Sequence, residues 1–245
     1  MVFNPWRITR AMFLEEYEVD SLLARLAGRV AEAAADDLGP RVDELIVQAL
    51  LFSGLRNSEF CQLKLADTIV GTGKSVFLVR GTPREDRTVF VPQAVSELVR
   101  RFVAEIRPRC LPDGASSRDH SLPLVLNERG KPYERTGLYR RVVRILSDAG
   151  LARRASVQLL RHTYGYLAYK RSGGNLLFVQ RQLGHAHPLV TSIYAEFVEE
   201  PYDKMADAVG ATAAADDRQA RTELRSKRSG VRHKGKGKGP RMKHG

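Results

Sequence analysis

The chain is organised around one segment, VDELIVQALLFSGLRNSEFCQLKL, which runs from Val42 to Leu65. Its first half is apolar nearly all round, a pattern typical of a helix that is buried on every side. Gly54 predicts the end of that helix, because glycine readily adopts the left-handed conformation that closes a helix. A new helix is expected directly afterwards, so Arg56 should lie at a helix start.

The segments on either side predict a mostly helical protein. Residues 13–35 place apolar side chains at helical spacing, and LGP at Leu38–Pro40 ends that pattern. SVFLVR and RTVFVP are rich in β-branched residues and flank GTPRED, which predicts a β-hairpin over residues 75–92. From Gln93 the helical pattern returns. The expected fold class is mostly α with a small antiparallel β-sheet (α+β).

Length and composition are those of a folded protein. The 245 residues are 43% hydrophobic, enough to build a core. No run of about 18 apolar residues and no basic-then-apolar leader occurs, so neither a membrane span nor secretion is indicated. The two cysteines show no framework spacing, which fits a reducing compartment. We therefore expect a cytoplasmic protein.

Positive charge is concentrated at the C-terminus. The net charge is +12, and residues 218–245 hold eleven Lys and Arg against the single acid Glu223, or +10. A Gly-, Lys- and Arg-rich composition cannot bury apolar surface, so we expect one domain over residues 1–210 and a disordered basic tail over residues 211–245. The tail indicates a polyanion such as nucleic acid as the partner, although it could also serve solubility alone.

Two motifs suggest cofactors that the rest of the sequence does not support. VGTGKS, Val70–Ser75, resembles the end of a phosphate-binding loop, but Thr68 stands where that loop needs its first glycine, and a strand follows instead of a helix. A β-turn is expected there, and no nucleotide cofactor. His185 and His187 lack nearby partners at metal-ligand spacing, so no metal site is expected.

Three separated segments carry a more specific pattern: LFSGLRNSEFCQLKLAD around Arg56, QLLRHTYG around Arg161, and LGHAHPLVTSIY, in which Tyr194 stands nine positions after His185. Together they resemble the tyrosine recombinase (phage integrase) family over about residues 12–200. The resemblance implies the family's catalytic-domain fold and site-specific cleavage and rejoining of double-stranded DNA. It also implies a 3′-phosphotyrosine intermediate, a tetramer of protomers on DNA, and no cofactor.

The resemblance assigns roles that agree with the chemistry of the side chains. Tyr194 is the expected nucleophile, because a phenolate can attack phosphorus and stay attached. Arg56 and Arg161 are expected to donate paired N–H groups to the scissile phosphate. His185 would donate a further hydrogen bond, and Glu59 would orient its partners.

Two positions depart from the family pattern. Arg84, eight residues before Pro92, stands where the family has a lysine that protonates the leaving oxygen, and arginine holds its proton too tightly for that task. Lys74 in the preceding turn is the alternative donor. Gln158 stands where the family usually has histidine, and an amide can hydrogen-bond a phosphate but cannot exchange a proton.

The residues next to these have more ordinary expected roles. His162 points about 100° round the helix from Arg161, so we expect a hydrogen-bonded structural residue. His187 is expected to cap a helix or lie on the surface, and TSIYAEF to form a short helix that presents Tyr194. Three further tyrosines are expected to pack in the core: Tyr164, Tyr166 and Tyr169.

Only about fifty residues precede Arg56, so the N-terminal DNA-clamping domain usual in the family is not expected, whether the chain is a stand-alone catalytic domain or a fragment. The leading hypothesis is a recombinase or integrase associated with the nucleoid. The alternative is a catalytically weak or inactive relative that binds DNA as an accessory protein.

Overall fold

The computed structural model describes residues 8–81, 85–112, 114–116, 119–127, 129–187, 189–198, 206–207 and 209. The chain divides into two units, Met1–Glu199 and Glu200–Gly245. In the second unit only Ala206, Asp207 and Val209 are described, and all three are exposed. The expected tail, residues 211–245, and Arg84 therefore lie outside the described residues.

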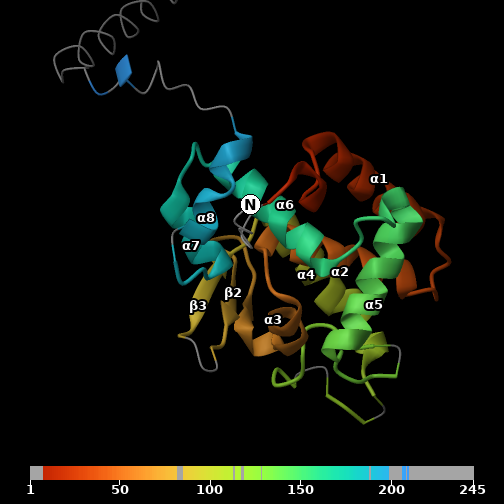
Figure 1. The fold of residues 1–245 in the computed structure, drawn as a ribbon. Helices are drawn as coiled ribbons and strands as arrows, with labels where there is room; N and C mark the ends of the chain where they lie inside the picture. Colours follow the sequence, from red (N-terminus) through yellow and green to blue (C-terminus); the bar gives the residue numbers. More distant parts are fainter. Residues whose placement is uncertain are drawn as a thin grey trace, which may run out of the picture. The chain divides into compact units, whose positions relative to one another are not determined.

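One helix forms the centre of the first unit. This helix, α2 (Gly39–Ser53), is buried along most of its length, as its sequence predicted. It contacts α1 (Glu16–Glu32), α4 (Gln93–Arg101), α5 (Arg135–Leu146) and α6 (Val157–Arg171), and Figure 1 shows these helices gathered around it. Burial of an apolar helix on all sides provides the main core of the unit.

The end of α2 fixes the start of the next helix. Gly54 has φ 63° and donates its backbone N–H to Leu50 O at 3.0 Å, which confirms the predicted termination. Arg56 then precedes α3 (Asn57–Gln62), and its backbone N–H donates to the Glu59 carboxylate at 2.7 Å. A side chain at the third helical position therefore caps the helix start.

A small antiparallel sheet lies beside the helices. β2 (Val76–Val79) and β3 (Arg87–Phe90) pair in the register Val79↔Arg87 and Val76↔Phe90, which confirms the hairpin. β1 (Thr68–Ile69) adds a third strand next to β2. It was not predicted, because two residues are too short to show alternation. The fold class is as expected, mostly α with a small antiparallel sheet.

The last two helices of the first unit lie one on the other, and the first of them packs against the sheet. α7 (Leu176–Leu183) packs against β3 and ends at Gly184, which has φ 62°. α8 (Leu189–Ser192) packs against α7 (Figure 1). The remaining short elements are 3-10 turns at Arg10–Met12, Leu65–Asp67, Arg107–Cys110 and Ala195–Phe197, and π turns at Phe102–Ile106 and Ser147–Leu151.

None of the helices in the described part of the chain is long and apolar enough to cross a bilayer.

Candidate active site

Arg161 is the buried centre of the site. It lies on α6, is 4% exposed, and donates from Nη2 to Leu183 O at 2.7 Å and from Nη1 to Gly54 O. These carbonyls close α7 and α2, and helix C-termini carry partial negative charge that stabilises a cation. Burial and the nearby charge of Arg56 lower the pKa of Arg161 to about 10, which leaves the guanidinium protonated at neutral pH.

Glu59 forms ion pairs with two more arginines, Arg56 and Arg87, close to Arg161. Its carboxylate accepts from Arg56 at 2.7 Å and from Arg87 through two bonds, each of 2.7 Å. Arg56 also donates to Gly184 O at 3.1 Å, and Arg87 to Gln182 O at 3.3 Å. Burial would raise the pKa of Glu59, but the hydrogen bonds from the two arginines outweigh it and lower that pKa to about 2. Two guanidinium groups therefore pair with the Glu59 carboxylate, and the third, that of Arg161, lies near enough to interact with it electrostatically. Three positive charges against one negative charge leave two positive charges in excess.

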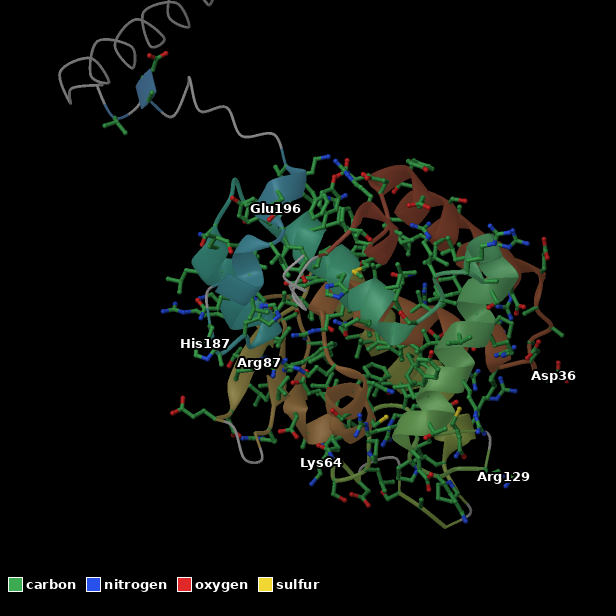
Figure 2. The ribbon with its side chains drawn as sticks, in the orientation of Figure 1. Asp36, Lys64, Arg87, Arg129, His187 and Glu196 are labelled. Atoms are coloured by element: carbon green, nitrogen blue, oxygen red, sulfur yellow. The ribbon has the colours of Figure 1, made fainter. Side chains whose placement is uncertain are left out.

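Arg87 was not predicted as a site residue. Figure 2 labels it where β3 meets α7, at the first residue of the strand. The sequence did indicate a strand beginning with arginine, but not that this strand would lie against the end of α7. The arginine cluster, by which we mean Arg56, Arg87 and Arg161 with Glu59, is therefore built from α3, β3 and α6.

His185 comes directly after Gly184, whose carbonyl bonds Arg56, and its imidazole ring is neutral. Its Nδ1 lies 2.9 Å from Thr191 Oγ1. Burial and the charges of Arg161 and Arg56 lower the pKa of His185 to about 3. A neutral imidazole carries one N–H, so His185 can offer a phosphate one hydrogen bond and no charge. His187, two residues on, is exposed (Figure 2), in agreement with its expected place on the surface.

Tyr194 is the residue whose placement differs most from expectation. The single short helix that would present it is broken, because the backbone N–H of Tyr194 bonds Thr191 O three residues back and α8 ends at Ser192. Its ring faces inward and is 1% exposed, so the prediction of a presented tyrosine is wrong. Burial raises the pKa of Tyr194 to about 12, which keeps the hydroxyl protonated.

The Tyr194 hydroxyl is bonded within the protein. Its oxygen lies 3.1 Å from His162 Nδ1, and Gln158 Nε2 lies 2.9 Å from the other ring nitrogen of His162. His162 is thus a hydrogen-bonded residue as expected, but the sequence did not indicate that its partner would be Tyr194. Gln158 is exposed, and its hydrogen bond is to His162 and not to the arginine cluster. The three tyrosines of α6 are buried as expected: Tyr164, Tyr166 and Tyr169.

The remaining expectations concern donors and metals. Lys74 is exposed in the link between β1 and β2, and Ser75 leads into β2 instead of a helix, which rules out the phosphate-binding loop. Arg84 lies outside the described residues. Among the residues that the structure describes, no group of three or more His, Cys, Asp or Glu is placed to hold a metal ion.

Comparison with known proteins gives a consistent result. The phage integrase family model matches residues 13–200. Tyrosine recombinase XerC of Halalkalibacterium halodurans is 30% identical over 190 residues, 77% of this chain and 58% of the relative. XerC of Thermodesulfovibrio yellowstonii is 29% identical, with 82% and 67% covered, and XerH of Helicobacter pylori is 26% identical, with 67% and 43% covered. The matched part of the chain thus spans between 43% and 67% of the length of these three relatives.

Solved structures share the fold. A complex described as XerH site-specific recombinase bound to palindromic difH substrate, post-cleavage, superposes with a TM-score of 0.63 at 25% identity, covering 81% of this chain and 53% of that one. XerA recombinase superposes with a TM-score of 0.60 at 23% identity, covering 82% and 65%.

Proposed function

Because this chain belongs to the phage integrase family, we propose that it is a site-specific DNA recombinase with Tyr194 as its nucleophile. The observation that carries this proposal is the arginine cluster, in which Arg56 and Arg87 pair with the Glu59 carboxylate, Arg161 is held by two backbone carbonyls, and a neutral histidine follows. A phosphodiester gains negative charge on its non-bridging oxygens during attack, and fixed N–H donors with excess positive charge stabilise that state.

In the proposed reaction, the Tyr194 hydroxyl gives its proton to water as Oη bonds to phosphorus. The bond to the 5′-oxygen breaks and that oxygen takes up a proton, giving a 3′-phosphotyrosine and a 5′-hydroxyl. Arg56 and Arg161 bind the phosphate, while Glu59 holds Arg56 in place through its 2.7 Å hydrogen bond. His185 gives one hydrogen bond through Nε2–H, in the tautomer whose Nδ1 accepts from the Thr191 hydroxyl. Attack by a 5′-hydroxyl on the phosphotyrosine reverses the bonding, so one ester replaces another.

The 5′-oxygen needs a proton as it leaves. Gln158 cannot supply it, because an amide does not titrate at neutral pH. Arg84, between β2 and β3 in the sequence, and Lys74 in the preceding link are the two proposed sources, and a lysine is the better acid of the two. Arg84→Lys should therefore speed strand cleavage if position 84 faces the leaving oxygen.

Tyr194 must leave its buried position before it reacts. A hydroxyl on a side chain that is 1% exposed cannot contact a phosphate outside the protein. The residues after α8 must therefore shift on DNA, and a neighbouring protomer in the proposed tetramer is where such a shift would be stabilised. The partner substrate is double-stranded DNA.

A second function is favoured by the same burial. A protein whose tyrosine stays buried would bind DNA through the arginine cluster and the basic C-terminus as an accessory factor without cutting it. Arg84 and Gln158, at positions where the family has lysine and histidine, agree with this alternative.

A covalent-capture experiment separates the two functions. The full chain is incubated with a library of nicked duplexes of randomised sequence, so that a cleaved strand loses its short 5′-hydroxyl fragment and cannot be rejoined. We expect a protein–DNA adduct that resists detergent and is absent in Tyr194→Phe. Tyr17→Phe, at a 73% exposed tyrosine on α1, is the matched control and should form the adduct normally. A gel shift without adduct in the wild type would support the accessory function, and sequencing the captured DNA would identify the target.

A further inference from the structure

Gly165 is a glycine in the interior of α6, where alanine would stabilise the helix by about 1 kcal/mol. A Cβ built on Gly165 would lie 2.5 Å from the hydroxyl oxygen of Tyr194 and closer still to Cζ of the ring. No real Cβ contact is that short. The missing side chain is therefore what allows the phenol of Tyr194 to lie against the helix backbone.

His162 and Gln158 continue this contact along the same face of α6. Residues three or four apart on a helix are neighbours on its surface, so Gln158, His162 and Gly165 form one stripe. His162 Nδ1 lies 3.1 Å from the Tyr194 hydroxyl, and its Nε2 lies 2.9 Å from the Gln158 amide nitrogen. The hydroxyl thus lies at the end of a chain of two hydrogen bonds whose other members are on α6.

The direction of these bonds follows from the donors and acceptors. An amide nitrogen only donates, so Nε2 of His162 must accept from Gln158. Burial and the charge of Arg161 lower the pKa of His162 to about 4, so the ring is neutral at pH 7 and carries one hydrogen. That hydrogen must be on Nδ1, which then donates to the oxygen of Tyr194.

We propose that Gly165 and His162 form a seat for the Tyr194 hydroxyl that withholds the nucleophile from DNA, and that Gln158 fixes His162 in the tautomer that donates to it. This proposal rests on Tyr194 being the nucleophile of the proposed function. His162 is a positioning residue, since it acts through Tyr194 and not on the phosphate. Gln158 sets the tautomer of His162. The family resemblance implied a different role for it, a hydrogen bond to the phosphate.

Nitrogen NMR of the histidine rings tests the tautomer. In the full-length protein with ¹⁵N-labelled histidine at pH 7, assigned with His162→Gln, His162 should show a protonated Nδ1 and an unprotonated Nε2. Gln158→Glu replaces the donor with a carboxylate that only accepts, so the hydrogen should move to Nε2. A helix-packing role for Gln158 would not move it. A wild-type His162 protonated on Nε2, or a pattern unchanged in Gln158→Glu, would overturn the tautomer assignment.

Chemical modification tests the seat, and the chain carries its own controls. Tetranitromethane nitration is mapped by peptide mass spectrometry. Tyr17, 73% exposed, should react in every sample, and Tyr164, 8% exposed on α6, should react only if the fold opens. Wild-type Tyr194 should be protected like Tyr164. Gly165→Ala and His162→Phe should each raise nitration of Tyr194 at least tenfold relative to Tyr17 while Tyr164 stays protected.

Reactivity of Tyr164 in one variant would mean that this variant unfolds, and the other variant then decides. If Tyr194 in a folded variant stayed as protected from nitration as it is in the wild type, the seat would be overturned.

In the covalent-capture assay, His162→Phe should form adduct at least threefold faster than the wild type, and an equal or slower rate would overturn the withholding role. Nitration and NMR use no DNA, so a wild type without adduct refutes the proposed function and leaves the seat standing, whereas adduct together with unchanged nitration refutes the seat alone.

Discussion

Glu59 shows how a single side chain organises the site. It is the third residue of α3, and its two oxygens receive the backbone N–H of Arg56, the side chain of Arg56 and both ends of the Arg87 guanidinium. Charged partners in a half-buried place interact strongly, and removal of one leaves the others uncompensated. The carboxylate is therefore required both for the helix start and for the spacing of the arginines.

Glu59→Gln should destabilise the protein by about 3 kcal/mol, because two partly buried guanidinium groups lose their counter-charge. The measurement is urea unfolding at pH 7. Glu16→Gln is the matched control: Glu16 pairs with Lys170 and Arg171, but its side chain is 42% exposed, so its loss should change stability by less than about 1 kcal/mol. Equal effects of the two substitutions would show that Glu59 is not a structural centre.

The two buried histidines predict a loss of stability in mild acid. The pKa values of His162 and His185 are lowered to about 4 and about 3 by burial, from an ordinary 6.5. Below pH 6.5 the histidines of the unfolded chain take up protons that the folded chain does not bind. The free energy of unfolding is therefore highest above pH 6.5 and declines as the pH falls toward 4. Each histidine contributes at most about 1.4 kcal/mol per pH unit, and less where solvent screens it.

The free energy of unfolding measured at pH 7 and pH 5 checks this. Glu59 does not disturb that window, since its own transition falls between its ordinary pKa of 4.5 and about 2. The double variant His162→Gln, His185→Gln should reduce the difference between the two pH values, while His187→Gln, at an exposed position, should leave it unchanged. An undiminished difference in the double variant would contradict the assignment.

At the scale of the elements, the ends of helices build the site. α2 and α7 both close on a glycine in the left-handed conformation, Gly54 and Gly184, and both ends place carbonyl oxygens against the arginine cluster. The last carbonyls of a helix have no partner within it, so they are available for guanidinium N–H groups. The same backbone feature therefore stops each helix and binds its arginine.

Gly54→Ala should destabilise the protein by about 2 to 4 kcal/mol, because a left-handed alanine is strained and its Cβ overlaps neighbouring side chains. That Cβ would lie 2.5 Å from Tyr164 Cδ1 and 2.7 Å from Leu183 Cδ2. Gly28→Ala is the control, since a Cβ there has no neighbour within 4 Å and lies inside α1. It should stabilise the protein by up to about 1 kcal/mol. Thermal unfolding of the two variants should shift in opposite directions.

On the scale of the whole molecule, charge is divided unevenly. Of the net +12, residues 218–245 carry +10 and residues 1–217 carry +2. A polyanion releases counterions when basic residues bind it, so the logarithm of the binding constant should fall steeply with the logarithm of salt concentration. The C-terminal segment should supply much of that dependence.

Removal of residues 218–245 should weaken binding to non-specific duplex DNA and reduce the slope of the salt dependence by about 0.9 for each phosphate that the segment neutralises. Fluorescence anisotropy between low and physiological salt measures both the affinity and the slope. The adduct of the covalent-capture assay should persist at low salt, because the arginine cluster is unchanged. Equal slopes for the full and shortened chains would show that the C-terminal segment does not bind DNA.

Expectations from local pattern were accurate where structure depends on near neighbours. The all-round apolar character of α2, the glycine that ends it, the hairpin and the helix start at Arg56 each involve residues within one or two turns of one another. The same reasoning missed β1, Arg87 and the contact between His162 and Tyr194. β1 was missed because it is only two residues long. The other two features depend on residues distant in the chain, 28 positions apart for Glu59 and Arg87 and 32 for His162 and Tyr194.

Periodicity and residue type were enough to predict the main helices and the hairpin, because each is encoded over a few consecutive positions, while the candidate site residues came from the resemblance to a family. Where the tyrosine would lie was a different matter. Its ring is buried because Gly165 on α6 leaves room for it and His162, one turn earlier on the same helix, bonds its hydroxyl. The residues around position 194 do not indicate either contact. Packing between distant segments chose the inward position, since burial of an aromatic ring with its hydroxyl satisfied is more stable than exposure of that ring to water.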